Sequence, residues 1–377
     1  MQVSEHIRQY IEAHRQEAFD LLVELAKIPA PSNHEEKRAA FCKAWLERQG
    51  AEGVYIDEAL NVIYPIGCTD TNDLVVFMAH SDVVFPDTEK LPLRIEGDRI
   101  YCPGVGDDTA NVAALLMTAK YIAQHKLQPK DLGVLLIINS GEEGLGNLKG
   151  SRRIMEAFGS RVREFVTLDG RTSSCVNRAV GSKRYRIEVD TEGGHSYANF
   201  GNRNAIAVLS SMIAKLYSIE VPPMGKTTYN VGTISGGTSV NTIAQHAEML
   251  YEFRSDEREA LAIMQNHLDA VLESFRQQGI RVTVTLVGDR PCAAAVDEEK
   301  MADMIQRAEA AAQRRYGHGL NLRSGSTDCN IPLSMGIPSL SLGCYRGEGA
   351  HTREEYVEIS SLHAGLQFAY DLILYHF

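Results

Sequence analysis

The 377-residue sequence has one tryptophan, no long hydrophobic run and no excess of positive charge. Its longest apolar stretches, such as residues 132–139, are far shorter than the roughly 20 residues that a membrane-spanning helix needs. The 38 basic and 49 acidic residues give a net charge of −11. This charge argues against a nucleic-acid binder and against a basic membrane-surface protein. We therefore expect no nucleic-acid partner and no membrane partner.

The cysteines form no recognisable framework. There are seven of them, an odd number, scattered along the chain without a Cys-x-x-Cys pair. This distribution argues against a set of structural disulfides and against a structural zinc knuckle. The first residues, Met1–His6, are polar and acidic, unlike a secretory signal. Together these features predict a cytoplasmic protein.

The composition is that of an ordinary globular protein, with 44% apolar and 23% charged residues. At roughly 150 residues per domain, the length predicts two domains. Apolar runs at 74–79, 132–139 and 165–168 alternate with helical patterns at about 109–125 and 149–158. This alternation is typical of an α/β domain in which helices cover both faces of a largely parallel sheet.

The pattern changes at about residue 182. From there to residue 291, alternating strands and amphipathic helices follow in the order β-α-β-β-α-β, which is the ferredoxin-like arrangement. After residue 291 the α/β pattern returns. We therefore predict a catalytic α/β domain made of residues 1–181 and 292–377, with a smaller ferredoxin-like α+β domain, residues 182–291, inserted into it.

Five short segments carry the candidate chemistry, and each is predicted to lie at or just after the carboxyl end of a strand. They are Ala79–Asp82, Gly106–Asp108, Ser140–Gly144, Leu168–Gly170 and Gly349–Thr352. In an open α/β sheet these ends meet at one crevice. Crowded carboxylates need a positive charge, and histidine with carboxylate ligands suits zinc, with cobalt or manganese as alternatives.

Polar residues at two places in the sequence fit helix caps, and one of these places is among the five segments. Asp108 is a suitable N-cap for the helix that follows it, and Ser32 with Glu35 forms a capping box before another helix. Taken singly, each acidic segment fits a solvated loop or a cap. Taken together, the five segments favour a metal centre.

This combination resembles the dizinc metallopeptidases and amidohydrolases that include peptidase T, glutamate carboxypeptidase, succinyl-diaminopimelate desuccinylase and aminoacylase. The resemblance covers nearly the whole chain and depends on the order and spacing of several short motifs. These are His80-x-Asp82, Gly104–Asp108, Glu142–Gly144, Asp169, Ala350–Thr352, Gly193–Ser196 and Gly236–Asn241.

The resemblance implies two divalent metal ions per chain, bridged by Asp107. His80 and Asp169 would complete one site, and Glu143 and His351 the other. Each ion would then have three protein ligands and a free position for water, which is the composition of a catalytic site. Zinc is the expected metal, with cobalt or manganese as alternatives.

The resemblance also assigns roles to residues that do not bind metal. Asp82 would orient His80, and Glu142 would be the general base that moves a proton from the attacking water to the leaving amine. His195 would polarise the scissile carbonyl, from its own or a partner subunit. Asn241 and Arg254 would hold a substrate carboxylate, although an arginine at a strand end is more often a surface residue.

The leading hypothesis is a dinuclear-metal exopeptidase that acts on short peptides, as in the peptidase T branch, with an activated water as nucleophile. The alternative is an N-acyl-amino-acid deacylase with the same centre, since Asp82-Val83-Val84 is the pattern of the carboxypeptidase and deacylase branches. A non-catalytic binding protein or a metal-stabilised scaffold would have no use for Glu142 beside a complete ligand set. The resemblance further implies a homodimer that forms through the inserted lid or dimerisation domain.

Overall fold

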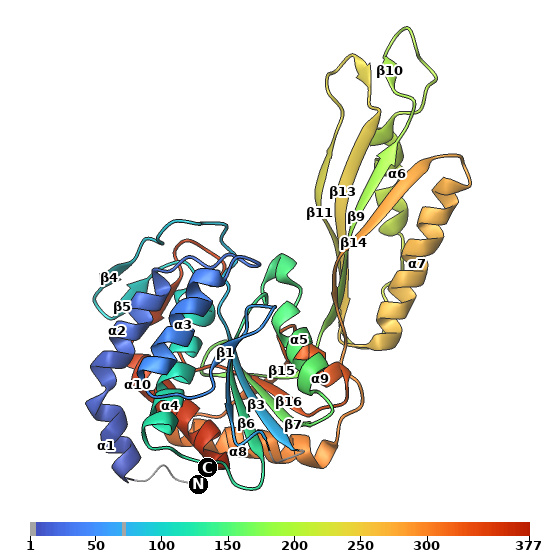
Figure 1. The fold of residues 1–377 in the computed structure, drawn as a ribbon. Helices are drawn as coiled ribbons and strands as arrows, with labels where there is room; N and C mark the ends of the chain where they lie inside the picture. Colours follow the sequence, from blue (N-terminus) through green and yellow to red (C-terminus); the bar gives the residue numbers. More distant parts are fainter. Residues whose placement is uncertain (1–4, 70–72) are drawn as a thin grey trace. The chain divides into compact units, whose positions relative to one another are not determined.

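The computed structural model describes residues 5–69 and 73–377, in which the chain builds two units (Figure 1). Unit 1 comprises Met1–Ala179 and Ala294–Phe377, and unit 2 comprises Val180–Ala293. The chain therefore leaves unit 1 once, forms unit 2 and returns. The predicted limits of the inserted segment, 182 and 291, lie close to the limits of unit 2.

An eight-stranded sheet lies at the centre of unit 1, in the order β1-β2-β6-β3-β7-β16-β8-β15. In sheet order, its strands are β1 (Tyr55–Ile56), β2 (Val62–Ile66), β6 (Gly133–Asn139), β3 (Leu74–His80), β7 (Val162–Leu168), β16 (Ser339–Leu342), β8 (Ser174–Ala179) and β15 (Asn321–Gly325). The four central strands β6, β3, β7 and β16 are parallel. Every residue of β3 and β6 is buried, as expected for strands covered on both faces. The predicted α/β class is confirmed.

Helices cover the sheet of unit 1. They are α1 (Glu5–Ala13), α2 (Arg15–Ala26), α3 (Glu36–Arg48), α4 (Asn111–Gln124), α5 (Lys149–Phe158), α8 (Glu298–Tyr316), α9 (Asn330–Ser334) and α10 (Ile359–Ile373). Helix α4 contacts the central strands, and α2, α3 and α10 pack against it. Helices α5 and α9 contact each other and lie apart from that group (Figure 1).

A small four-stranded sheet adjoins the site described below. It has the order β17-β18-β5-β4, from β17 (Gly347–Glu348), β18 (Tyr356–Glu358), β5 (Arg99–Tyr101) and β4 (Arg94–Glu96). One irregular helical turn, Val105–Ala110, links β5 to α4. Two 3-10 turns, Gly144–Gly146 and Leu374–His376, complete the unit.

Unit 2 is an antiparallel sheet with two helices. In chain order it contains β9 (Gly181–Asp190), β10 (Gly194–His195), α6 (Ala205–Leu216), β11 (Thr227–Gly236), β12 (Thr242–Ile243), β13 (His246–Ser255), α7 (Arg258–Arg276) and β14 (Arg281–Arg290). The main sheet has the order β11-β13-β9-β14, and β10 pairs separately with β12. Both helices pack on this sheet through residues such as Leu209, Met264 and Leu268, which are fully buried.

No helix in the described part of the chain is long and apolar enough to cross a membrane. All seven cysteines are free thiols.

Candidate metal centre

Parallel strand pairing brings three of the predicted segments together. His80 is the last residue of β3 and pairs with Asn139 at the end of β6. The loop that carries Glu142 and Glu143 begins just after β6, and Asp169 follows β7, the neighbour of β3 on its other side. The side chains that follow three adjacent strands therefore share one edge of the sheet, as the sequence predicted.

Asp107 lies between two histidines. Its Oδ1 atom is 3.1 Å from Nε2 of His80, and its Oδ2 atom is 3.2 Å from Nε2 of His351. His351 is also 2.8 Å from Oε1 of Glu143. Each carboxylate oxygen of Asp107 thus faces a different histidine, and the two histidines come from opposite ends of the sequence.

The potential ligand atoms form overlapping groups, each with its atoms within 4.8 Å of one another. One group contains His80, Asp107, Asp108 and Asp169, and another contains Asp107, Glu143 and His351. Asp107 belongs to both. All five residues predicted as metal ligands are therefore present in two groups that share one carboxylate.

The electrostatics of the centre reflect burial and crowding. Burial raises the pKa of Glu143 to about 7, and it raises the pKa of Asp169 well above its ordinary value. Burial also acts against the charged form of Asp107, but bonds with His351 and His80 outweigh it and lower its pKa. Bonds with Asp107 and Glu143 raise the pKa of His351 to about 10. The group as a whole favours bound positive charge.

Asp82 is fully buried and has more partners than the sequence suggested. The Nδ1 atom of His80 lies 3.1 Å from the backbone carbonyl of Asp82 and 3.5 Å from its Oδ1 atom, so both groups of Asp82 face the ring that they are proposed to orient. The Asp82 carboxylate also accepts the backbone N–H groups of Glu142 and Glu143, each at 2.9 Å, and the hydroxyl of Ser32 at 2.7 Å. Burial would raise the pKa of Asp82, but bonds from His80 and Ser32 lower it overall.

Both predicted helix caps are wrong. The side chains of Asp108, Ser32 and Glu35 cap no helix and instead form hydrogen bonds with residues around the metal centre. Asp108 is fully buried and accepts the backbone N–H of His80 at 3.0 Å and the side-chain amide of Asn111. Helix α3 begins at Glu36 without a side-chain cap. The Glu35 carboxylate instead accepts the backbone N–H of Gly141 at 3.0 Å and pairs with a lysine.

Further supporting residues were missed from the sequence. Glu355, which is buried, accepts the backbone N–H groups of Gly104, Gly106 and Asp107 at 2.7, 3.0 and 2.7 Å. Arg38, also buried, donates to the carbonyl of Ser81 at 2.7 Å. Each of these side chains holds the backbone that carries a candidate ligand. Their targets are backbone groups far away in sequence, and no local motif signals such a contact.

The remaining predicted site residues belong to unit 2. His195 is exposed and lies on β10, and its Nδ1 atom accepts the backbone N–H groups of residues 197 and 198. Asn241 lies beside it, because the backbone N–H of Ser196 donates to its carbonyl at 2.9 Å. The structure thus brings His195 and Asn241 together within unit 2.

The structure does not bring Asn241 and Arg254 together. Arg254 lies near the carboxyl end of β13, where it is opposite Ser182 of β9 in the strand register. Asn241 lies before His246, the first residue of β13. The eight residue steps from 246 to 254 span about 26 Å at roughly 3.3 Å per step. Both guanidinium contacts of Arg254 go to Glu252, at 3.0 Å each. Within one chain the two residues therefore lie apart, and their shared role in holding a substrate carboxylate stays a prediction.

Comparison with known proteins identifies the class. Residues 76–375 match the family described as peptidase family M20/M25/M40. The sequence is 24% identical over 363 residues to a Mycobacterium tuberculosis protein provisionally named succinyl-diaminopimelate desuccinylase DapE, covering 93% of this chain and 96% of the relative. The fold is similar to that of a tripeptidase from Staphylococcus aureus, with a TM-score of 0.77, 22% identity and coverage of 95% and 97%. It is also similar to the Bacillus subtilis protein YxeP, a dinuclear metal-binding peptidase of family M20, with a TM-score of 0.66, 18% identity and coverage of 97% and 99%.

The chain belongs to peptidase family M20/M25/M40. As a member of this family it is a hydrolase of the metallopeptidase and amidohydrolase type, as the sequence resemblance predicted. The candidate metal ligands lie in unit 1, and all of them fall within the matched residues.

Proposed function

We propose that this protein is a dinuclear-metal exopeptidase that cleaves an amide bond of short peptides. The observation that carries the proposal is the position of Asp107, whose two oxygens face His80 and His351 separately. A carboxylate that bridges two cations needs one oxygen directed at each site. Asp169 on one side and Glu143 on the other would bring each set to three ligands.

The donor atoms fit two divalent cations. Imidazole nitrogens and carboxylate oxygens suit zinc, and also cobalt or manganese. Burial raises the pKa values of Glu143 and Asp169, so a bound cation would help to keep both ionised at neutral pH. When bound, two such cations would supply Lewis acidity, which lowers the pKa of water and polarises a scissile carbonyl.

Glu142 is our candidate for the general base. It is 5% exposed, and its backbone N–H is fixed by Asp82. Its carboxylate is grouped with His80 and Glu143, so it lies beside the ligands. We propose that Glu142 takes the proton of the attacking water and delivers it to the nitrogen of the leaving amine.

His195 is our candidate for polarising the scissile carbonyl. Since Nδ1 accepts two backbone N–H groups, the ring proton of the neutral imidazole resides on Nε2. Nε2 is then a hydrogen-bond donor suited to a developing oxyanion. The role requires His195 to reach the scissile bond in its own or a partner subunit.

An N-acyl-amino-acid deacylase is the second candidate, supported by the relative named as a desuccinylase. Matched substrates separate the two: the dipeptide Ala-Leu and N-acetyl-Leu present the same leaving amino acid. We expect the zinc- or cobalt-loaded protein to hydrolyse Ala-Leu faster, and chelator-treated protein to hydrolyse neither. Faster hydrolysis of N-acetyl-Leu would assign the protein to the deacylases. No hydrolysis of any di- or tripeptide or N-acyl amino acid would contradict both.

We also propose that the protein is a homodimer that pairs through unit 2. Strand β11 lies at the edge of its sheet and most of its residues are exposed, including Ile234 at 52%. Such an edge offers unpaired backbone groups to a second chain.

A cytoplasmic location is consistent with the seven free thiols.

A further inference from the structure

A pocket of about 700 Å³ lies in unit 1 beside Asp107 and Asp169. Its wall comes from the loop after β7, from β15 and from the segment 345–350. This volume falls within the usual range for small-molecule sites. The pocket is therefore large enough to hold part of a substrate whose scissile bond lies at the metal ligands.

Three arginines line the pocket, and only one is neutralised. Arg346 donates to Glu358 at 2.8 Å. Arg171 donates to the carbonyl of Gly347 at 3.1 Å, and Arg323 donates to the hydroxyl of Ser174 at 2.7 Å. These last two acceptors are neutral. Within the described part of the chain, no carboxylate oxygen lies within 4.0 Å of the nitrogens of Arg171 or Arg323.

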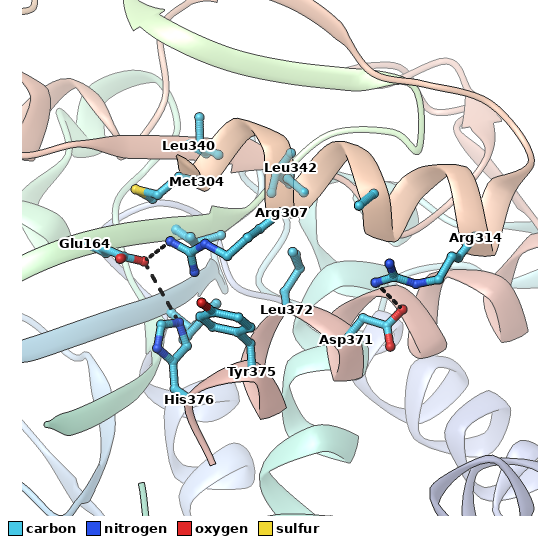
Figure 2. Close-up of a pocket in the computed structure, with 14 residues that line it drawn as sticks. Glu164, Met304, Arg307, Arg314, Leu340, Leu342, Asp371, Leu372, Tyr375 and His376 are labelled. Atoms are coloured by element: carbon cyan, nitrogen blue, oxygen red, sulfur yellow. Dashed lines mark hydrogen bonds and ion pairs between the residues drawn. The ribbon is translucent and has the colours of Figure 1, made fainter. Parts of the chain in front are cut away.

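A second pocket of the same unit shows the contrast (Figure 2). It lies between α8, α10 and the sheet, and has a volume of about 120 Å³. There Arg307 pairs with Glu164 at 2.8 Å, and Arg314 pairs with Asp371 at 3.5 Å. The charged residues of that pocket thus neutralise one another.

The acidic residues of the larger pocket do not neutralise the positive charges of Arg171 and Arg323. Asp107 and Asp169 are the candidate metal ligands, so bound cations would offset their charge. Glu358 is occupied by Arg346, which leaves Glu348 as the remaining carboxylate of the wall. Two guanidinium groups against one carboxylate leave a site that favours an anion.

We propose that this pocket binds a carboxylate of the substrate through Arg171 and Arg323. The inference rests on the proposed function and specifies its substrate class: peptides or acylated amino acids that carry an acidic side chain or a dicarboxylic acyl group. Guanidinium groups bind carboxylates through two parallel hydrogen bonds. Because neutral acceptors already hold one N–H of each arginine, both side chains are partly preorganised for that contact.

The test compares acids with their isosteric amides. We would measure kcat/KM of the metal-loaded protein for Glu-Ala against Gln-Ala, and for Ala-Glu against Ala-Gln. We expect the acid to be preferred by about tenfold or more in at least one pair, as charge-assisted hydrogen bonds allow. The variants Arg171→Gln and Arg323→Gln should each reduce this preference.

The control is Arg48→Gln, which removes one exposed positive charge from α3, outside the pocket. It should leave the preference for the acid unchanged. Ratios near one in both substrate pairs, or a preference that neither pocket variant reduces, would overturn the inference. The proposed peptidase function would survive either result, because both amides and acids could still be hydrolysed.

A binding measurement separates failure of this inference from failure of the proposed function. Calorimetry would compare glutarate with its neutral diamide, glutaramide, on metal-loaded wild-type protein and on both variants. If no peptide is cleaved, the proposed function fails, and the pocket is judged by binding alone. We expect the wild-type protein to bind glutarate more tightly than glutaramide. We expect Arg323→Gln to bind glutarate about tenfold more weakly than the wild-type protein does, and the unfolding temperature of the variant checks that it is folded. Equal binding of the two compounds would overturn the inference.

Discussion

The carboxylate of Asp82 accepts the backbone N–H of Glu143 at 2.9 Å while lying 3.5 Å from the ring of His80. One buried side chain thus links a candidate ligand of one metal to a candidate ligand of the other. It also accepts the backbone N–H of Glu142, the candidate base. The positions of His80, Glu142 and Glu143 therefore depend on a residue that is not itself expected to bind metal.

Replacing Asp82 with Asn should weaken metal binding. An amide has one acceptor oxygen instead of two, so its NH₂ group would face a backbone N–H of the Glu142–Glu143 loop. We expect a 10- to 100-fold loss of metal affinity, typical for residues that orient ligands. Competition with a chelator measures this. Asp87→Asn is the control, because Asp87 pairs with Arg353. Unchanged affinity in Asp82→Asn would remove its positioning role.

The substrate role predicted for Arg254 can be tested against its contact with Glu252. Arg254→Lys keeps the charge but loses the two parallel bonds of the guanidinium. If Arg254 binds a terminal carboxylate, the variant should lose kcat/KM on free-acid peptides and lose little on amidated ones. Equal losses on both substrates would leave Arg254 as the structural partner of Glu252.

The dimer proposal predicts that a charge on the edge strand disrupts association. Ile234 is half-exposed on β11, so Ile234→Lys should not affect the fold of unit 2 but should oppose pairing of two edges. Sedimentation at micromolar concentration should give a dimer for the wild-type protein and a larger monomer fraction for the variant. A wild-type monomer would refute the dimer and would leave His195 to act within its own chain.

His376 should make the protein sensitive to acid. It is 7% exposed, its ring centroid lies 5.6 Å from that of Phe77, and its Nε2 atom lies 4.0 Å from Glu164, the partner of Arg307 (Figure 2). Burial, together with the smaller effect of the Arg307 charge, lowers its pKa to about 3. The unfolded chain takes up the proton at its ordinary pKa of about 6.5, so stability falls as the pH drops from there towards 3. At pH 5 the contribution is about 2 kcal/mol. His376→Gln should therefore lose less unfolding free energy between pH 7.5 and pH 5 than the wild-type protein. An equal loss would contradict this origin.

The sequence predicted the parts of the site that depend on strand order. His80, Glu143 and Asp169 follow buried apolar runs, so the parallel arrangement alone places them at one edge. Strand order alone does not predict the contact of Asp107 with His351. Asp107 lies in an irregular turn and His351 follows a two-residue strand, and their pairing was implied by the family resemblance.

The supporting residues could not be predicted, because a buried polar side chain gives no sign of which backbone group it binds. Ser32 and Glu35 match a helix capping box, yet Ser32 donates to Asp82 and Glu35 accepts from Gly141. Likewise, Glu355 binds the turn that carries Asp107, nearly 250 residues earlier in the sequence. Tertiary contacts thus replaced the local bonds that the motif predicted.

Metal content measured on the reconstituted protein tests the dinuclear centre most directly. Elemental analysis should give two divalent ions per chain for the wild-type protein and for Glu142→Gln, because Glu142 is assigned as a base and not as a ligand. Turnover of Glu142→Gln should fall by about 10²- to 10⁴-fold, the usual contribution of general acid–base catalysis. Glu143→Gln should lose the ion at one site. One ion or none in the reconstituted wild-type protein, or loss of an ion in Glu142→Gln but not in Glu143→Gln, would contradict the assignment.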